Sequence, residues 1–321
     1  MMRRLGVVMD PIAGIHPEKD STLAMLLEAA RRGWELNYME LGDLRLRDGH
    51  AEATVRPLTV QDDNSHWFEL GEATDIALGD LDVILMRKDP PFDLEYLAVT
   101  YVLDRAESEG ALVVNRPGAL RDSNEKAFIG WFADCSPPTL MTRSIPQLRA
   151  FMSEHSAIVL KPLYAMGGRS VFLVRHDDPN ATVIFEEMTE REGRTIIAQA
   201  FVPDVAVSGD KRILMVDGHA VPHAIARIPR AGELRANIAA GGSVHPIELD
   251  DRDRAICAAV GPVLRERGLW FVGLDVIGGY LTEINVTSPT CIREIDRLFG
   301  LNVAAMLLNT VERLWESATR I

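Results

Sequence analysis

Short apolar runs and helical apolar stripes alternate over the first third of the chain. Leu23, Leu26, Leu27 and Ala30 share one helical face, and Gly33 follows the last turn. Because such strands and helices alternate, we expect a mainly parallel sheet covered by helices on both faces. The predicted strands cover residues 5–9, 34–39, 83–86 and 111–114, and the predicted helices cover residues 21–32 and 94–108.

The pattern changes at about residue 122 to shorter strands joined by glycine-containing turns. Such turns, of which Asp217-Gly218 is one, are typical of antiparallel hairpins. We therefore expect an N-terminal α/β domain followed by a larger α+β part. The later predicted strands cover residues 158–161, 170–174, 195–200, 212–216 and 220–226, and the later helices cover residues 253–266 and 303–315.

Composition narrows the range of partners. The 321 residues are 47% hydrophobic and carry 34 basic against 47 acidic side chains, a net charge of −13, so nucleic acid is not expected as a partner. No apolar run reaches the roughly 18 residues of a membrane span. The apolar run before Asp10 is too short for a signal peptide. Three cysteines without a C-x-x-C pair fit a reducing cytoplasm, where we expect the protein to reside.

The first candidate site is a glycine loop that follows a buried strand. Gly167 and Gly168 allow backbone N–H groups to point into one concavity, which is a way to bind phosphate oxygens. Lys161 ends the preceding apolar run and needs a counter-anion, which a phosphate would supply. An ordinary hairpin loop, with the Lys161 ammonium group in solvent, is the alternative.

The second candidate is a hairpin with acidic and amide groups on apolar strands. Glu283 and Asn285 are two residues apart and share a face. A two-residue turn at 278–279 would place Asp275 on the opposite face, whereas a three-residue loop would place it directly across from Glu283. Oxygen ligands of this type suit Mg²⁺. A metal site therefore predicts the three-residue loop, and a solvated hairpin face is the alternative.

Arginines form the third candidate. Arg212, Arg227 and Arg293 are suited to neutralising charge in phosphoryl transfer and to holding carboxylates, although each alone is typical of a surface arginine. The Ala- and Gly-rich segment 228–243 has the composition of a mobile lid, and a disordered surface loop is the alternative. The chain has no G-x-S-x-G, P-loop or G-x-G-x-x-G motif, so hydrolase, P-loop and Rossmann interpretations lack their signature.

Five segments together resemble the bacterial-type glutathione synthetase family of ATP-grasp ligases. The resemblance runs from about residue 4 to the C-terminal helix, and two of the segments are long and specific. The segments are Met9 to Ile12, Leu85 to Asp93, Asn124 to Lys126, Ala226 to Pro229 and Thr282 to Glu294.

The resemblance implies a reaction and an architecture. ATP phosphorylates the carboxylate of γ-glutamylcysteine, and the amine of glycine displaces phosphate to give glutathione. Two Mg²⁺ ions act with ATP, with Mn²⁺ as a possible substitute, and the chain forms a homo-oligomer, expected to be a tetramer. The ATP-grasp fold implies an N-terminal α/β substrate-binding domain at 1–122, a central subdomain at 123–200 and a C-terminal subdomain with the metal site and lid at 201–321.

The resemblance also implies roles for individual residues. The expected ATP-binding residues are Lys126, Lys161, Gly167, Gly168, Gln199, Ala200, Phe201, Val202 and Asp210. The expected catalytic residues are Arg212 and Arg227, and the expected metal ligands are Asp275, Glu283 and Asn285. The expected substrate-binding residues are Arg87, Lys88, Ser288, Thr290 and Arg293.

One position departs from the family pattern. Where the family usually has Asp-Gly before Met-Gly-Gly, this chain has Tyr164-Ala165. Gly167 and Gly168 are retained, so we expect ATP binding to persist. Two other functions remain open at this point: another ATP-grasp ligase, which joins D-alanines or adds glutamate to a protein tail, and a nucleotide-binding regulatory module without turnover.

Overall fold

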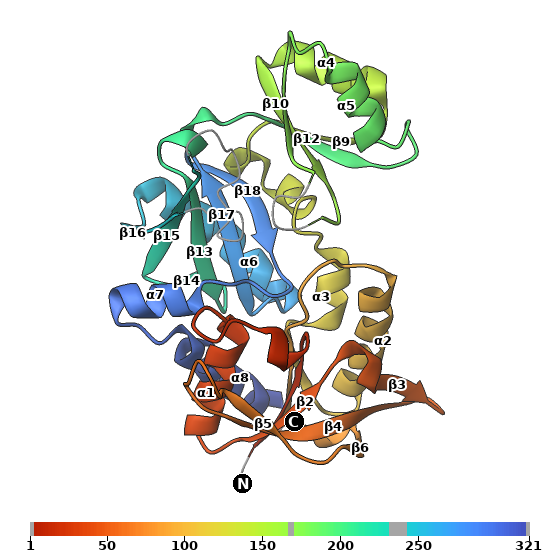
Figure 1. The fold of residues 1–321 in the computed structure, drawn as a ribbon, viewed down its shortest axis with the longest axis vertical. Helices are drawn as coiled ribbons and strands as arrows, with labels where there is room; N and C mark the ends of the chain where they lie inside the picture. Colours follow the sequence, from red (N-terminus) through yellow and green to blue (C-terminus); the bar gives the residue numbers. More distant parts are fainter. Residues whose placement is uncertain (1–2, 166–169, 231–242, 319–321) are drawn as a thin grey trace.

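The computed structural model describes residues 3–165, 170–230 and 243–318, in which the strands form three sheets (Figure 1). The first sheet has the strand order β3-β4-β2-β1-β7-β8, with β5 and β6 paired to β4. Strands β2, β1, β7 and β8 are parallel, as predicted, whereas β4 runs antiparallel to β2. The bounds are β1 Arg4–Val8, β2 Glu35–Met39, β3 Leu44–Arg47, β4 His50–Val60, β5 Phe68–Leu70, β6 Thr74–Ala77, β7 Val83–Met86 and β8 Leu112–Val114.

Helices cover both faces of this sheet because its strands are apolar on both sides. Val7 and Leu85 face a cluster shared with α1 (Ser21–Arg31) and α8 (Val303–Ala318). Val8 and Met86 face the opposite cluster, which α2 (Leu94–Ser108) and α3 (Pro117–Asp122) complete. The C-terminal helix α8 therefore packs beside α1, at the start of the chain.

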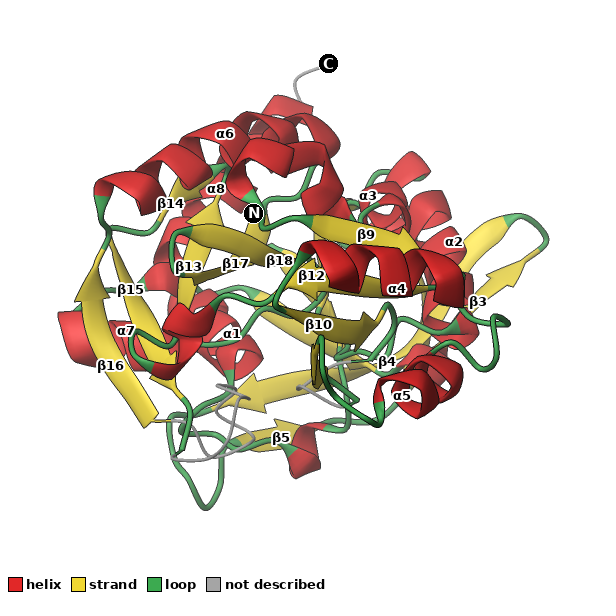
Figure 2. Cartoon of the chain, turned by 90° about the horizontal axis from the view of Figure 1, so that it is seen from above, coloured by secondary structure: helices red, strands yellow, loops and turns green. Residues whose placement is uncertain are grey.

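The second sheet is a small antiparallel one with the strand order β11-β10-β12-β9. Helices α4 (Ile145–Glu154) and α5 (Ala181–Met188) pack beside each other against it and close a separate apolar core (Figure 2). The bounds are β9 Thr139–Thr142, β10 Ala157–Pro162, β11 Phe172–Arg175 and β12 Ile196–Ala200.

The third sheet has the order β16-β15-β13-β17-β18, with β14 paired to β13, and every pair is antiparallel. The predicted strand 220–226 is in fact two strands, because Pro222 has no N–H to continue the ladder. The bounds are β13 Asp210–Val216, β14 His219–Ala220, β15 His223–Ile228, β16 Ser243–Glu248, β17 Phe271–Ile277 and β18 Tyr280–Asn285. The helices of this part are α6 Asp251–Arg267 and α7 Ile292–Phe299.

Several short 3₁₀ helices complete the connections. They are η1 Ile12–Gly14, η2 Leu41–Asp43, η3 Leu78–Asp80, η4 Phe128–Cys135 and η5 Pro203–Ala206. Within the described part of the chain, no helix is both long and apolar enough to cross a membrane.

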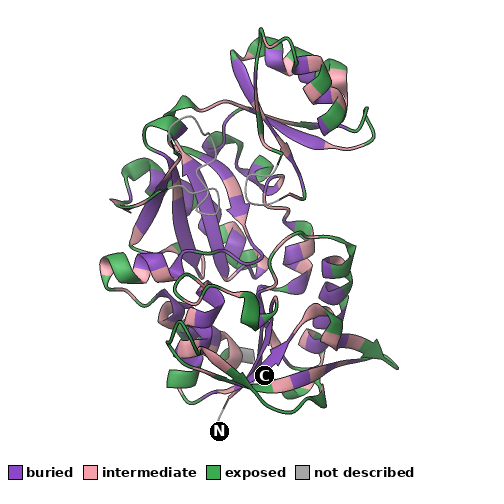
Figure 3. Cartoon of the chain, in the orientation of Figure 1, coloured by how far each residue is buried: buried purple, intermediate pink, exposed green. Residues whose placement is uncertain are grey.

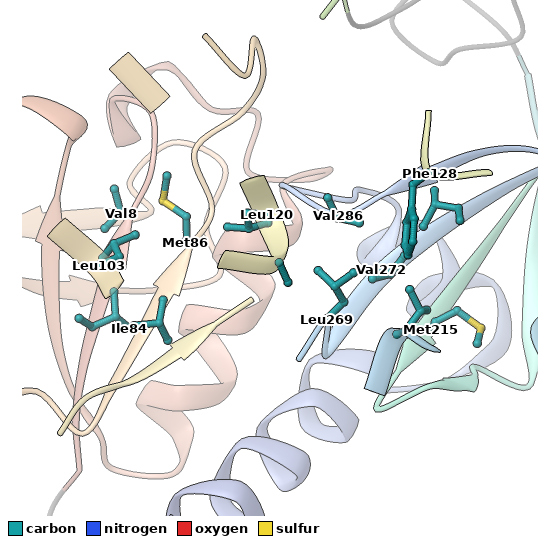
Figure 4. Close-up of a cluster of buried hydrophobic side chains, with 14 of the residues drawn as sticks. Val8, Ile84, Met86, Leu103, Leu120, Phe128, Met215, Leu269, Val272 and Val286 are labelled. Carbon is teal, nitrogen blue, oxygen red and sulfur yellow. The ribbon is translucent and has the colours of Figure 1, made fainter. Parts of the chain in front are cut away.

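The first and third sheets share a continuous core. Buried residues are concentrated on their strands (Figure 3), and Ile84, Leu120 and Val272 belong to one apolar cluster that spans both sheets (Figure 4). Asn115, just after β8, adds a polar link, since its Nδ2 donates to the carbonyl oxygens of Phe271 and Val286 at 2.8 Å each. The third sheet is thus fixed on the first one.

Candidate active site

Acidic groups of the third sheet meet on neighbouring strands. Asp275 of β17 lies directly across from Glu283 of β18, as the metal-site hypothesis requires. The predicted three-residue loop is wrong, however, because Ile277 pairs with Tyr280 across a two-residue turn. A β-bulge restores the register: Thr282 is the extra residue, and its Oγ1 donates to the Asp275 carbonyl oxygen at 3.1 Å.

Two arginines from adjacent strands hold the Asp275 carboxylate. Arg212 of β13 donates through Nε to Oδ1 at 2.7 Å and through Nη2 to Oδ2 at 3.2 Å. Arg227 of β15 brings its Nη2 to 3.0 Å from Oδ1. Burial alone would raise the pKa of Asp275, but the guanidinium groups outweigh it and hold the pKa well below its usual range. Asp275 is therefore a buried, ionised anchor for two cations.

Asp210 supplies the second carboxylate of this network. It pairs with Arg227 across β13 and β15, and its Oδ2 accepts from the Arg227 Nη2. Burial raises the pKa of Asp210 to about 7, although Arg227 partly offsets the effect. Asp210 Oδ1 and Arg227 Nε are buried and have no hydrogen-bond partner among the described residues. These atoms are available to a bound molecule.

Two lysines lie near Glu283: Lys161 from the second sheet, and Lys126 from the segment between α3 and η4. Lys161 of β10 donates to Glu283 Oε1 at 3.2 Å, and the Lys126 ammonium group contacts Glu125 and the Ala165 carbonyl oxygen. Burial opposes ionisation of Glu283, yet Lys126 and Lys161 lower its pKa. For Glu125 burial dominates, and its pKa is raised. Lysines, arginines and carboxylates thus converge between the second and third sheets.

The donors on β18 fit a hard divalent cation chemically. Asn285 Nδ2 donates to the Gly273 carbonyl oxygen at 3.2 Å, and this hydrogen bond fixes the orientation of the side-chain amide. Within the described chain, no hydrogen-bond donor reaches Asn285 Oδ1 or Glu283 Oε2. Both carboxylate oxygens of Asp275 already accept hydrogen bonds from arginines. No group of three or more His, Cys, Asp or Glu side chains among the described residues has the arrangement of a metal site. Glu283 and Asn285 thus offer the free oxygen ligands.

The expected adenine-side residues form the connection between the second and third sheets. Gln199 is the penultimate residue of β12, where it is buried and its Nε2 donates to Thr139 Oγ1 at 3.3 Å. Ala200, Phe201 and Val202 follow it toward η5. The predicted phosphate-loop residues Gly167 and Gly168, and most of the predicted lid 228–243, lie outside the described residues.

The expected substrate-side residues meet where β7 and β18 end. Lys88 Nζ lies 2.9 Å from Asp10 Oδ1, and Ser288 Oγ donates to Asp89. Arg87 is buried, and Thr290 Oγ1 lies 3.6 Å from the Cys291 sulfur. Arg293 instead lies in α7, where its Nη2 pairs with Asp62 Oδ1 at 2.8 Å.

A cavity of about 580 Å³ opens beside this region. Its lining is mainly apolar and includes Phe92, Leu97, Leu163 and Tyr164, with Glu125 at its edge. Tyr164, which departs from the family pattern, is 61% exposed and faces this cavity. The departure therefore places an aromatic ring beside the site rather than in the core.

Sequence reasoning assigned no role to two acids of the site. Glu125 lies next to Lys126 and also accepts from the Ile284 N–H through its carbonyl oxygen, at 2.9 Å. Asp89 accepts from Ser288 and its N–H donates to Asp10 Oδ2 at 2.9 Å. Both lie in segments that carry the family resemblance, and this position is the sequence feature from which a role in the site could have been predicted.

Comparison with known proteins decides the family. The chain matches the prokaryotic glutathione synthetase N-terminal domain over residues 3–121 and the prokaryotic glutathione synthetase ATP-grasp domain over residues 125–300. The chain belongs to the prokaryotic glutathione synthetase family. Glutathione synthetases of Shewanella oneidensis and Escherichia coli K12 are each 54% identical to it over 311 residues, which are 97% of this chain and 98% of each relative.

Two solved structures illustrate the fold that this family member shares with other proteins. The crystal structure of the D-cycloserine synthetase DcsG has a TM-score of 0.67 at 16% identity and covers 98% of this chain and 99% of its own. The ATP-grasp ligase PsnB, complexed with minimal precursor, Mg and ADP, has a TM-score of 0.62 at 15% identity and covers 97% and 98%. The chain therefore has the ATP-grasp fold, as the sequence predicted.

Proposed function

We propose that the charged cluster between the second and third sheets is the catalytic centre of this ligase. The enzyme uses ATP to join γ-glutamylcysteine to glycine, releasing glutathione, ADP and phosphate. The observation that carries the assignment is the convergence of Lys126, Lys161, Arg212 and Arg227 on the paired acids Asp275 and Glu283.

Activation of a carboxylate is the chemical task of this centre. An oxygen of the cysteinyl carboxylate attacks the γ-phosphorus of ATP, ADP leaves, and an acyl phosphate forms. The glycine amine then attacks the carbonyl carbon, and the tetrahedral product collapses as phosphate leaves with the electron pair of the C–O bond. The amine nitrogen loses one proton to complete the amide. No enzyme nucleophile is required, which agrees with the absence of a catalytic-triad motif.

The four cations are assigned to the negative charge of this reaction. Lys126 and Lys161 hold phosphate oxygens of ATP, while Arg212 and Arg227 stabilise the acyl phosphate and its tetrahedral successor. Asp275 keeps both guanidinium groups in fixed positions, so no reorganisation is needed when charge develops. The low exposure of the two arginines, 5% and 3%, strengthens their effect on a bound anion.

Further ATP contacts are assigned by position. Gln199, Ala200, Phe201 and Val202 line the adenine pocket, because they form the connection between the sheets that close on the nucleotide. Asp210 completes the ATP-binding set, and its free Oδ1 is an acceptor for a bound hydroxyl. Gly167 and Gly168 are assigned to the phosphates from the sequence alone.

The family generally needs a divalent metal, and we assign two Mg²⁺ ions that act with ATP, with Mn²⁺ as a substitute. Glu283 and Asn285 would hold the metal through their free oxygens. Asp275 is assigned as the third ligand because it lies across from Glu283, although both of its oxygens contact arginines in this structure. When bound, the metal neutralises phosphate charge. Lys88, Ser288, Thr290 and Arg293 are assigned to the substrate carboxylates.

Two properties of the enzyme in the cell complete the proposal. The cysteines Cys135, Cys257 and Cys291 are free and buried, which supports a reducing cytoplasm. The chain forms a homotetramer, and light scattering of the purified protein measures this directly: a mass four times 35.5 kDa supports the tetramer, whereas 35.5 kDa contradicts it.

Phosphate release tests the assigned reaction. The purified protein is mixed with ATP and Mg²⁺, and γ-glutamylcysteine and glycine are added singly and together, with D-alanine and glutamate as controls. We expect full release only with γ-glutamylcysteine and glycine together, with glutathione as the product. Release with D-alanine or glutamate instead indicates a different ligase, and tight ATP binding without release for any pair indicates a regulatory module.

A further inference from the structure

Arg87 is a buried cation at the end of β7, and it contacts the protein on both sides. It is 6% exposed, and its guanidinium group lies 5.6 Å from the centre of the Phe271 ring. Its Nε donates to Thr22 Oγ1 at 3.1 Å, and its Nη2 donates to the Pro289 carbonyl oxygen at 3.0 Å. The planar guanidinium therefore connects α1 to the segment that follows β18.

That segment, residues 287–291, lies between β18 and α7, and two further contacts attach it and the first residue of α7 to the N-terminal part of the chain. Ser288 Oγ donates to Asp89, two residues after Arg87. The N–H of Ile292, the first residue of α7, donates to Ser21 Oγ at 3.1 Å. Three separate contacts from α1 and the end of β7 thus fix one short connection.

The connection contains a residue in an unfavourable backbone conformation. Cys291 has φ 89°, in the left-handed region that favours glycine, and its side chain is buried. Such a conformation is unfavourable for a non-glycine residue and persists only where the surrounding structure holds it. The contacts of Arg87, Asp89 and Ser21 lie on either side of Cys291 and supply that restraint.

We propose that Arg87 is a positioning residue: it holds segment 287–291 in place through Thr22 and Pro289, rather than binding a substrate carboxylate itself. The inference rests on the proposed function, which assigns Ser288 and Thr290 to the substrates. The segment directly follows Glu283 and Asn285, so its position also sets the distance between the ATP side and the acceptor side of the site. Both donors of Arg87 described above are already occupied by protein acceptors.

Two substitutions separate positioning from direct binding. R87K keeps the charge but loses the fork that reaches two acceptors at once. T22V removes only the hydroxyl that orients Arg87, and Thr22 is a buried residue of α1 outside the assigned site. T100V is the matched control, because Thr100 is likewise buried and its Oγ1 accepts from Arg121 at 3.1 Å, away from segment 287–291.

Kinetics give the first readout. For R87K we expect kcat to fall about tenfold and the KM for γ-glutamylcysteine to rise about tenfold, with the KM for ATP changed less than about twofold. T22V should move the same two constants in the same directions by about threefold, and the double variant should be no worse than R87K alone. T100V should leave all three constants within about twofold of the wild type.

Thiol labelling gives a readout that does not depend on turnover. Cys291 and Cys257 are both buried, so their alkylation by iodoacetamide, located by peptide mass spectrometry, reports local opening. For R87K we expect the Cys291-to-Cys257 labelling ratio to rise about tenfold, and T100V should leave it unchanged. Global destabilisation would instead raise both rates together.

The outcomes separate the possibilities. A labelling ratio for R87K within about twofold of the wild type, or T22V with wild-type kinetics beside a raised KM in R87K, overturns the positioning role. The second result would assign Arg87 to direct substrate binding. If the wild-type protein shows no phosphate release that depends on γ-glutamylcysteine and glycine, the proposed function fails instead, and the labelling ratio still tests the contact.

Discussion

Two charged clusters in this chain use the same residue types in different ways. In the site cluster, Asp275 binds Arg212 and Arg227, and all three side chains are nearly inaccessible. In the terminal cluster between α1 and α8, Glu28 binds Arg31 and Arg32, but Arg31 is 69% exposed. Solvent hydrates the Arg31 guanidinium group, whereas the charges of Arg212 and Arg227 are compensated by buried carboxylates. Burial of this kind is costly and indicates a function beyond stability.

Hydrogen bonding separates the clusters further. Both Glu28 oxygens accept hydrogen bonds, from Arg31, Arg32 and Asn302. In the site cluster, Asp210 Oδ1 and Arg227 Nε have no partner among the described residues. Buried polar groups are normally satisfied, so these unpaired atoms, beside the other charged groups of the cluster, support the proposed binding of a polar molecule here. In the terminal cluster, both Glu28 oxygens already have hydrogen-bond partners within the protein.

The largest expected effect follows from D275N. The amide leaves two guanidinium groups buried without their anion, so we expect a loss of about 3–5 kcal/mol in the free energy of unfolding. We also expect kcat/KM to fall about 10³-fold, because both arginines lose their positions. Urea unfolding and phosphate release measure the two effects.

D217N is the matched control for this substitution. Asp217 also holds two arginines, Arg265 and Arg313, but Arg265 and Arg313 are 46% and 57% exposed. We expect D217N to keep kcat/KM within about twofold of the wild type. Equal losses of activity in D275N and D217N would remove the distinction between the clusters.

The next effect in size is that of R227K. Lysine keeps the charge near Asp210 and Asp275 but presents one donor point instead of a planar group. We expect kcat to fall about 10²-fold, with the dissociation constant for ATP changed less than about threefold. Steady-state kinetics and ATP titration check this. A kcat within about threefold of the wild type would mean that Arg227 has no part in stabilising the reacting groups.

A smaller effect is expected in the terminal cluster. E28Q removes the charge that accepts from two arginines and Asn302, and we expect the free energy of unfolding to fall by about 1 kcal/mol without a change in kcat. Urea unfolding measures it, and E18Q serves as the control because the exposed Glu18 forms a single long ion pair among the described residues, with the exposed Lys19 at 4.0 Å. A loss of catalysis in E28Q would show that the terminal cluster also serves the site.

The smallest effect is a dependence on pH. Arg31 lowers the pKa of Glu28 from 4.5 to about 2, so its contribution to stability is fully present above about pH 4.5 and is lost as the pH falls toward 2. The difference in unfolding free energy between wild type and E28Q should therefore shrink between these values. Unfolding at several pH values tests this, and a constant difference would contradict the lowered pKa.

Much of the fold was predictable because its pattern was strong. Strand β7 is entirely apolar and β1 is apolar after Arg4, and helices α1 and α2 have clear start signals, with Asp20 and Asp93 as caps. The strand β4 was not predicted. Its buried positions alternate, but Ala51 and Ala53 occupy two of them, and alanine is both weakly hydrophobic and uncommon in strands.

The site was predictable in its residue types but not in its local geometry. Alternation placed Glu283 and Asn285 on one face, and the pairing of Asp275 with Glu283 is confirmed. The bulge at Thr282 was not predictable. Hydrophobic alternation shows which residues of a strand share a face, but it does not show where one strand has an extra residue opposite its partner. The contacts of Arg87 with Thr22 and Pro289 join segments far apart in the chain, which no local pattern encodes.

The most direct test of carboxylate activation follows an isotope. γ-Glutamylcysteine labelled with ¹⁸O in its cysteinyl carboxylate is incubated with the enzyme, ATP, Mg²⁺ and glycine, and the released phosphate is analysed by mass spectrometry. An acyl phosphate requires one labelled oxygen to move from the carboxylate into each phosphate released. Phosphate without the label, formed together with glutathione, would contradict that chemistry at the cluster around Asp275.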